Sequence, residues 1–160
     1  MRMRLEKLVE RKFVGSRMSM SLTENKTSEL WQSFMPKRKE IQNSIGTNIF
    51  SIQVYDQYYF DIGKPRKTFD KWAAIEVSEF NSIPVDMETL ILTGGLYAVF
   101  KLHGTASRNK KSKLYIFGTW LPSSIYLLDN RPHFEVLGED YDYDDPPFDE
   151  EIWIPIKLKK

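Results

Sequence analysis

Short segments in which every second side chain is apolar recur along the chain and predict β-strands. The predicted strands cover residues 13–22, 49–55, 72–77, 87–92, 96–102, 132–138 and 151–156. Two further segments, Leu30–Met35 and Ile116–Leu121, carry apolar residues at the spacing of one helical face. Pro36 and Pro122 follow them and are expected to end or kink the helices. The pattern therefore predicts an α+β fold with an antiparallel sheet and two helices.

The order strand, helix, strand, strand occurs twice, and the two copies can be aligned. The aligned segments are Leu30–Pro36 with Ile116–Pro122 at an offset of 86 residues, Phe50–Val54 with Pro132–Val136 at 82, and Trp72 with Trp153 at 81. Such self-similarity indicates a duplicated unit. We therefore expect a single domain over residues 1–160, built from pseudo-repeats over 11–80 and 87–157. These would be duplicated βαββ units related by a pseudo-twofold axis, with a groove between the halves.

Side chains alternate between the two faces of a strand, so the aliphatic face of each strand can be assigned to the core. The opposite face then collects Gln53, Tyr55, Trp72, His133, Glu135 and Trp153. Two tryptophans at equivalent positions are unexpected on a solvated sheet face. The alternative is that a loop over 63–68 covers the tryptophans and that Glu135 is solvated. If the face is a groove, Glu135 lies at its centre, and its negative charge is on the second half alone because its counterpart is Gln53.

The composition supports a folded chain with an unusual share of rings. Hydrophobic residues make up 41% and charged residues 28% of the 160 residues, which are globular values. Aromatic residues reach 14% and need either burial or a site that uses their faces. A carboxylate among such faces suits a lipophilic cation, because ring quadrupoles attract the positive charge and the carboxylate neutralises it.

Charge and residue usage exclude several other classes of function. The net charge is +1 and no basic excess is present, so we expect no direct contact with nucleic acid. No run approaches the ~20 apolar residues of a membrane span, and we expect no membrane contact. With no cysteine and two histidines, neither a metal site nor a cofactor is predicted. A cytoplasmic location is the expected one.

Four motifs carry a resemblance to a known family. They are Pro84–Glu88, then Thr93–Val99 within TGGLYAVF, then Phe134-Glu135 on a strand, and the closing Glu151–Ile156. In their order and spacing, from about residue 11 to the end, the chain resembles the gyrase-inhibitor-like small-molecule-binding family. The same domain is the effector-binding domain of AraC-type and multidrug-responsive transcription regulators.

The resemblance implies a duplicated βαββ fold with a ligand groove between the halves. It also implies a strand glutamate that meets cationic ligands, and the matching position is Glu135. Regulators of this family carry a helix-turn-helix before the domain. Only about ten residues precede it here, so we expect a stand-alone member that reads no DNA itself.

Three functional classes follow from these observations. The first is a binding protein for small amphipathic, cationic molecules. Its expected ligand-binding residues are Glu135, Trp72, Trp153, Tyr55, Gln53, Tyr97, Trp120 and His133. The second is a hydrolase of cyclopropane-type electrophilic toxins, with Glu135 as the base that activates water; no other catalytic residue is predicted. The third is a protein-interaction module, such as a gyrase partner. His133 could orient Glu135 or relay a proton, or be an ordinary strand histidine.

Overall fold

The chain is an α+β domain in a computed structural model that describes residues 2–60, 67–141 and 148–159, without the side chains of 106–109 and 148. The strands are β1 Arg2–Leu8, β2 Arg11–Met20, β3 Ile49–Val54, β4 Phe69–Val77, β5 Glu88–Leu92, β6 Gly95–Gly104, β7 Tyr126–Leu128, β8 His133–Leu137 and β9 Phe148–Leu158. The helices are α1 Thr27–Lys37, α2 Ala106–Tyr115 and the short α3 Leu121–Ser123. All seven predicted strands are present, while β1 and β7 were not predicted.

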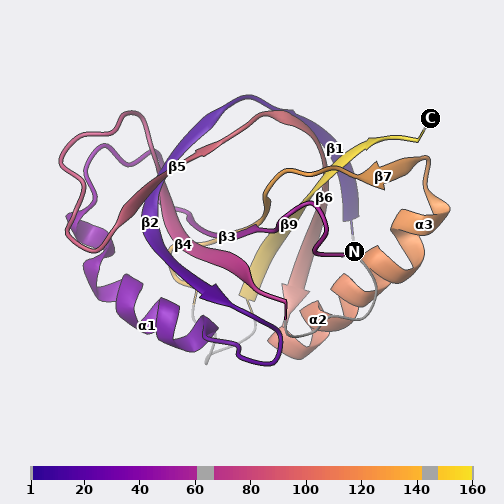
Figure 1. Cartoon of the computed structure of the whole chain (residues 1–160), viewed down its shortest axis with the longest axis horizontal. Coiled ribbons are helices and arrows are strands. Elements are labelled where there is room, and N and C mark those ends of the chain that lie inside the picture. Colours follow the sequence, from indigo (N-terminus) through magenta and orange to yellow (C-terminus); the bar gives the residue numbers. More distant parts are fainter. Residues whose placement is uncertain (1, 61–66, 142–147, 160) are drawn as a thin grey trace.

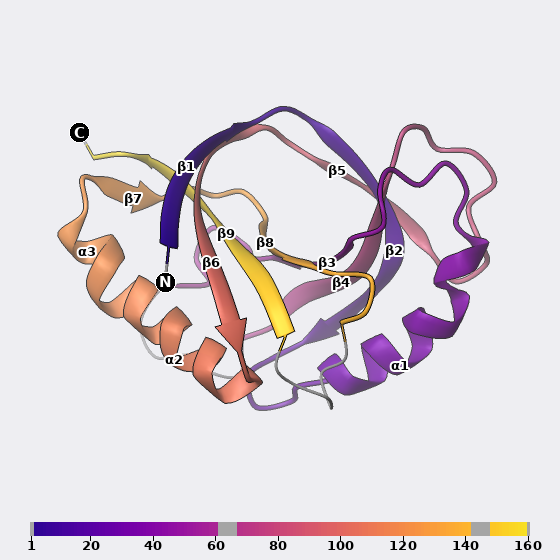
Figure 2. The same ribbon diagram turned by 180° about the vertical axis from the view of Figure 1, so that it is seen from behind.

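The strands form one curved antiparallel sheet in the order β1-β6-β9-β8-β3-β4-β2-β5, and β7 pairs with β9. The order is palindromic: reversing it exchanges β1 with β5, β6 with β2, β9 with β4 and β8 with β3. The α1 helix lies beside one half of the sheet, and α2 with α3 lies beside the other (Figures 1 and 2). This arrangement is the duplicated βαββ fold that the sequence predicts.

The strand register agrees with the offsets found in the sequence. At the centre of the sheet β3 pairs with β8, so that Ser51 faces Glu135, Ile52 faces Phe134 and Gln53 faces His133. A twofold axis through the Ile52–Phe134 pair exchanges Gln53 with Glu135, which is the offset of 82. Trp72 pairs with Ile52 and Trp153 with Phe134, so the two tryptophans are equivalent as well.

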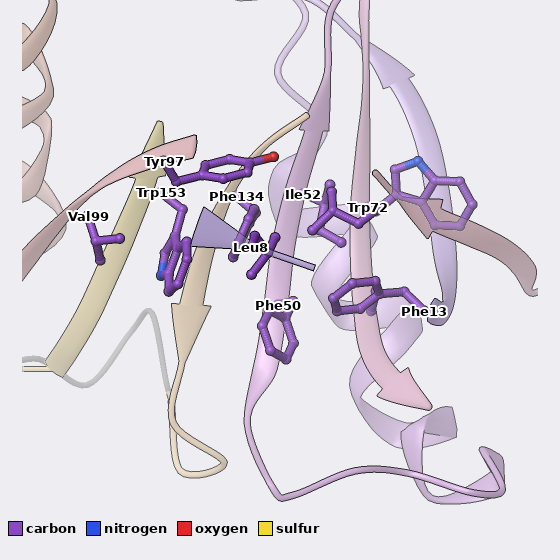
Figure 3. Packing of buried hydrophobic residues seen from close by; sticks show 11 residues of the cluster. Leu8, Phe13, Phe50, Ile52, Trp72, Tyr97, Val99, Phe134 and Trp153 are labelled. Carbon is purple, nitrogen blue, oxygen red and sulfur yellow. The ribbon is translucent and has the colours of Figure 1, made fainter. Parts of the chain in front are cut away.

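Both faces of the central strands are buried, and this overturns one prediction. Ile52 and Phe134 pack in one cluster with Trp72, Trp153, Leu8, Phe13, Phe50, Ala74, Leu92, Tyr97 and Val99. Figure 3 shows this cluster, with Trp72 toward one end and Trp153 toward the other. Paired residues share a face, so Trp72 and Trp153 lie opposite to Glu135. Their predicted position on the Glu135 face is wrong, because the aliphatic faces of neighbouring strands were all assigned to a single core.

The other face of the sheet packs against the helices. Under α1 a second cluster includes Leu30, Phe34, Ala73 and Ile75, and a third near α2 includes Phe100, Ile116, Ile152 and Ile154. Burying apolar surface on both faces gives the sheet two cores. The strip of β3 and β8 between the helices carries the polar residues described below.

The prolines fall inside or at the start of helical segments and do not end them. Pro36 lies within α1, one residue before its end. Pro122 lies in the short α3, which directly continues the helical turn Ile116–Trp120. Between α2 and α3, Ile116–Trp120 forms a π-helical turn, a rare local widening that often occurs at functional sites.

The Gly94-Gly95 pair lies where the β1–β2 and β5–β6 connections approach each other. A Cβ on Gly94 would lie 2.3 Å from the carbonyl oxygen of Leu8. Gly95 has a φ of 148° and packs against the guanidinium of Arg131. Gly94 is therefore required by close packing, and Gly95 by its backbone conformation. Among the described residues, no helix is long and apolar enough to cross a membrane.

Candidate functional site

A polar group lies on the helix-facing side of the sheet, between α1 and α2. Glu135 and His133 come from β8, and their partners in the register, Ser51 and Gln53, come from β3. Gln53 pairs on its other side with Lys71 of β4. These five side chains share one face because paired residues point the same way. Glu135, His133, Ser51 and Gln53 are all buried. Figure 2 shows β8, β3 and β4 side by side between the two helices.

Glu135 forms a short ion pair with Lys113 of α2. The Lys113 Nζ donates to Glu135 Oε1 at 2.6 Å, and the side-chain exposures are 41% for Lys113 and 7% for Glu135. A charge-assisted hydrogen bond of this length is among the stronger polar contacts in proteins. The carboxylate is therefore deep in the structure, and the ammonium that neutralises it lies beside it at the end of a partly exposed side chain.

A second lysine lies near the same carboxylate. Lys71 Nζ donates to Thr27 Oγ1 at the start of α1, at 3.1 Å. Thr27 in turn donates to Asn25 Oδ1 at 2.6 Å, which fixes its hydroxyl. The site thus holds two lysine side chains near one buried carboxylate. Neither lysine was among the residues expected at the site.

The pKa values of these groups reflect burial and mutual attraction. Burial alone would raise the pKa of Glu135, but Lys113 and Lys71, with a hydrogen bond from Gln53, hold it below its usual value. Burial opposes the charge on Lys113, yet Glu135 outweighs it and raises the Lys113 pKa. For Lys71 burial dominates, and together with the repulsion of Lys113 it lowers the pKa in spite of Glu135.

His133 is surrounded by rings that form an aromatic cage beside the ion pair. We define the aromatic cage as Tyr55, Tyr59, Phe60, Phe69, Phe117 and His133. The imidazole stacks on Phe60 and Phe117 at centroid distances of 5.5 and 6.1 Å and meets the edge of Tyr55 at 4.9 Å. Tyr55 also contacts Tyr59 at 4.5 Å and Phe69 at 5.1 Å. Cage and carboxylate are adjacent because His133 and Glu135 lie two residues apart on β8.

Four of the eight predicted site residues come together here. Gln53, Tyr55, His133 and Glu135 share the face and the cluster, as strand alternation predicted. Trp72 and Trp153 lie on the opposite face, as described above. Tyr97 lies in that same cluster, where its hydroxyl donates to the Pro132 carbonyl at 2.8 Å.

Trp120 also lies outside the site, because of its position in the π-helical turn. Its ring meets Phe100 edge-on at 5.0 Å and stacks on Tyr126 at 6.4 Å. Phe117, three residues earlier in the same turn, stacks on His133 instead. The placement of Tyr97 and Trp120 in the groove is therefore corrected to structural packing.

Sequence reasoning missed both lysines and four rings of the cage. Tyr59 and Phe60 follow β3, and Phe69 begins β4. Lys113 and Phe117 come from the α2 segment, whose direction depends on the π-helical turn. Of these residues, Lys71 could have been placed from the sequence. It lies one residue before Trp72, and strand alternation places it on the opposite face from that tryptophan.

Two surface hollows lie away from these residues: one of about 320 Å³ beside α1 at Arg17 and Met87, and one of about 280 Å³ at Lys101 and Glu150. In the part of the chain that is described, no group of acidic or histidine side chains has the arrangement of a metal site. Most of the loop over 63–68, the alternative cover for the tryptophans, lies outside the described residues. Glu135 is buried, contrary to the solvated alternative.

The buried His133 predicts a loss of stability in mild acid. Burial lowers its pKa from 6.5 to about 4, so between these values the unfolded chain binds a proton that the folded chain does not. The free energy of unfolding should therefore fall as the pH falls from 6.5 to 4, by up to ~3 kcal/mol. Urea unfolding at pH 7 and pH 5 measures this loss.

The matched variants for this prediction are His133→Phe and His103→Gln. Phenylalanine keeps the ring contacts but cannot take a proton, so the loss between pH 7 and pH 5 should shrink. His103 has a side-chain exposure of 65%, and its replacement should leave the loss unchanged. An undiminished acid loss in His133→Phe would contradict the assignment.

Comparisons with known proteins agree with this fold. Among solved structures, SAV2435 bound to tetraphenylphosphonium is 16% identical with a TM-score of 0.71, covering 98% of this chain and 94% of that one. The C-terminal domain of EcmrR is 14% identical with a TM-score of 0.70, covering 99% and 98%. A hydrolase from Listeria innocua is 8% identical with a TM-score of 0.61, covering 97% and 91%. At these identities the likeness shows the fold alone.

The sequence itself gives the family. No curated protein sequence matches the chain. The family described as GyrI-like small molecule binding domain matches residues 1–157, nearly the whole chain. The duplicated βαββ sheet is the fold that the resemblance implied. The chain therefore belongs to the GyrI-like small molecule binding domain family.

Proposed function

We propose that the chain binds small amphipathic cations in the aromatic cage, where the cation replaces the Lys113 ammonium at Glu135. The observation that carries the proposal is the 2.6 Å ion pair between Lys113 and a carboxylate that is otherwise buried beside six rings. An ammonium of the chain itself already occupies the position that a ligand cation would take. Exchanging one cation for another leaves Glu135 neutralised, so the exchange avoids a bare buried charge.

Lys113 is suited to leave this position. Its side chain is 41% exposed, so the ammonium can reach water without unfolding of the domain. The neighbouring residues Lys110, Lys111, Leu114 and Tyr115 of α2 are exposed and contribute no buried apolar contact. Ile116 is the first buried residue after them. The ion pair is therefore one of the contacts of this part of α2 with the sheet.

The rings of the aromatic cage provide affinity for a hydrophobic cation. A cation over an aromatic face gains ~0.5–2 kcal/mol per ring, and the gain rises as water is excluded. His133, with a pKa of about 4, stays neutral near pH 7 and adds no repulsion. SAV2435, which shares the fold, was solved bound to tetraphenylphosphonium, a lipophilic cation, and this supports the choice of probe.

Two ions of the same shape and opposite charge test the proposal. Tetraphenylphosphonium should raise the melting temperature with increasing concentration, because a ligand at 100 times its Kd stabilises the folded state by ~2.7 kcal/mol. Tetraphenylborate should give little or no rise. Equal stabilisation by both ions would show that shape and apolar contact decide binding, and the role of Glu135 would be wrong.

Two ring substitutions distinguish binding in the aromatic cage from binding on the opposite face of the sheet. Phe117→Leu removes a stacked ring from His133 and should weaken tetraphenylphosphonium binding, measured by calorimetry, by ~0.5–2 kcal/mol. Trp72→Phe removes volume from the opposite cluster and should lower the free energy of unfolding by ~1–3 kcal/mol. Its affinity for the cation should stay within about twofold of wild type. A large affinity loss in Trp72→Phe would place the ligand on the other face.

Hydrolysis of an electrophile is the second candidate, and one fold relative from Listeria innocua is a hydrolase. A general base works best when its pKa lies near the working pH. The pKa of Glu135 is held below its usual value, so Glu135 is a weak base in the closed site. We therefore expect an electrophilic ligand to be depleted at most stoichiometrically. Catalytic turnover that Glu135→Gln abolishes would favour the hydrolase.

We also propose the remaining properties that were expected from the sequence. They are a location in the cytoplasm, the lack of direct contact with nucleic acid, and a role as a sensor or sequestering domain. A protein partner of the gyrase type is a separate prediction. Co-purification that recovers no such partner would count against it.

A further inference from the structure

Lys71 occupies the inner wall of the site and has no part in the cation exchange described above. It lies on β4 opposite Gln53, on the face that holds Glu135 and His133. Phe69, a member of the aromatic cage, precedes it by two residues and therefore points to the same side. The amine thus lies on the same face of the sheet as the rings and the carboxylate.

The environment of Lys71 does little to keep it charged. Its hydrogen-bond acceptor is the neutral hydroxyl of Thr27, at 3.1 Å. Glu135, the buried carboxylate on this face, is hydrogen-bonded by Lys113 instead. Among the described residues, no ion pair within 4.0 Å includes Lys71. Glu135 and Glu150 attract its charge from a distance, and Lys113 repels it.

We propose that Lys71 is a nucleophilic amine that captures hydrophobic aldehydes as a Schiff base inside the aromatic cage. The proposal rests on the proposed function in one respect, namely that small molecules enter this site. Enzymes that use lysine as a nucleophile activate it in the same way, by desolvation or by a second cationic group nearby. Both conditions are met at Lys71, and the lowered pKa is their consequence.

The reaction needs no co-reactant other than the aldehyde. The free amine attacks the carbonyl carbon, the C=O π pair moves to oxygen, and a carbinolamine forms. One proton of the amine nitrogen passes to this oxygen and gives the carbinolamine hydroxyl. The hydroxyl then leaves as water with the second nitrogen proton, and a C=N bond remains between the ligand and Lys71. Glu135, on the same face of the sheet, can carry these protons from nitrogen to oxygen. One aldehyde and one amine give one imine and one water.

The rings decide which aldehydes fit. Tyr55, Phe60, Phe117 and the other cage members offer apolar faces, so an aromatic aldehyde gains stacking that a small hydrophilic one does not. The ammonium of Lys113 moves outward in the same way as for a cation. The expected substrates are therefore hydrophobic aryl aldehydes.

Reductive trapping with site-resolved mass spectrometry tests the proposal. The full chain is incubated at pH 7 with 2-naphthaldehyde and sodium cyanoborohydride, and labelled peptides are mapped over time. We expect Lys71 to be labelled several-fold faster than the exposed Lys110 and Lys111, because the cage holds the aldehyde beside Lys71.

Two variants and one competitor complete the experiment. Lys71→Met should abolish the fast labelling, while Lys111→Met should not. If Lys71→Met fails to fold, the labelled positions in the wild-type protein still decide the test. Tetraphenylphosphonium should protect Lys71. Uniform labelling of all lysines, or fast labelling of Lys113 instead, overturns the proposal. If the cation binds but Lys71 reacts slowly, only the nucleophile is wrong; if the cation does not bind while Lys71 reacts fast, the cation site is wrong.

Discussion

Lys113→Met should bind tetraphenylphosphonium at least about tenfold more tightly than wild type, because it removes the chain's own competitor for Glu135. In wild type the ligand must displace an ammonium that is hydrogen-bonded at 2.6 Å. Methionine keeps the unbranched apolar stem of lysine but leaves the carboxylate open to the ligand. Calorimetric titration of both proteins at one pH and salt concentration gives the ratio of the two Kd values.

The same substitution should destabilise the unliganded protein. It leaves Glu135 buried with Lys71 and Gln53 as its remaining partners. Breaking a buried ion pair costs several kcal/mol, but the exposure of Lys113 and the presence of Lys71 reduce the expected loss to about 1–3 kcal/mol. Urea unfolding measures it, with the exposed Lys111→Met as the control. Tighter binding together with lower stability is the signature of an internal competitor. A fall in both would instead make Lys113 part of the binding surface.

Glu135→Gln should weaken tetraphenylphosphonium binding about 30-fold or more, because a buried cation then has no carboxylate. Glutamine has nearly the same shape, and Lys113 can turn into solvent, so the fold should survive the change. The matched control is Glu151→Gln. The Glu151 carboxylate lies outside the site and forms an ion pair with Arg4 at 3.0 Å. Calorimetry on the three proteins should show a loss in Glu135→Gln alone. Equal affinity in all three would mean that the cation never meets Glu135.

The fold was largely predictable because the apolar pattern repeats. Seven strands and α1 follow from alternation and helical spacing, and the offsets of 82 and 81 match the register about the Ile52–Phe134 pair. The second predicted helix, Ile116–Leu121, coincides with the π-helical turn and the start of α3, while α2 lies before it. The edge strand β1 was missed, since Met3 and Leu5 remain half-exposed there and charged residues separate them. The three-residue strand β7 is too short to show a period.

Half of the expected site residues were placed correctly, because strand alternation relates residues within one strand but not between neighbouring strands. Alternation fixes which residues of one strand share a face, and it brought Gln53, His133 and Glu135 together correctly. When both faces of a sheet are buried, alternation does not show which face of the neighbouring strand lies on the same side of the sheet. Trp72 and Trp153 were therefore paired correctly with each other but assigned to the wrong side.

The countercharges could not be predicted because they depend on three-dimensional packing. Lys113 lies in a polar stretch of the chain that reads as a solvated helix start. Its approach to Glu135 depends on how α2 crosses the sheet. Phe117 and Trp120 have similar apolar character, and the π-helical turn between α2 and α3 directs only Phe117 toward His133.

In the proposed complex a cation takes the place of Lys113 at Glu135 inside the aromatic cage. The decisive measurement is a crystal structure of the chain with tetraphenylphosphonium. We expect the phosphorus within ~6 Å of cage ring centroids, the ligand against the Glu135 carboxylate, and the Lys113–Glu135 hydrogen bond broken. A cation bound on the Trp72–Trp153 face or in the hollow beside α1, with the 2.6 Å bond intact, would contradict it.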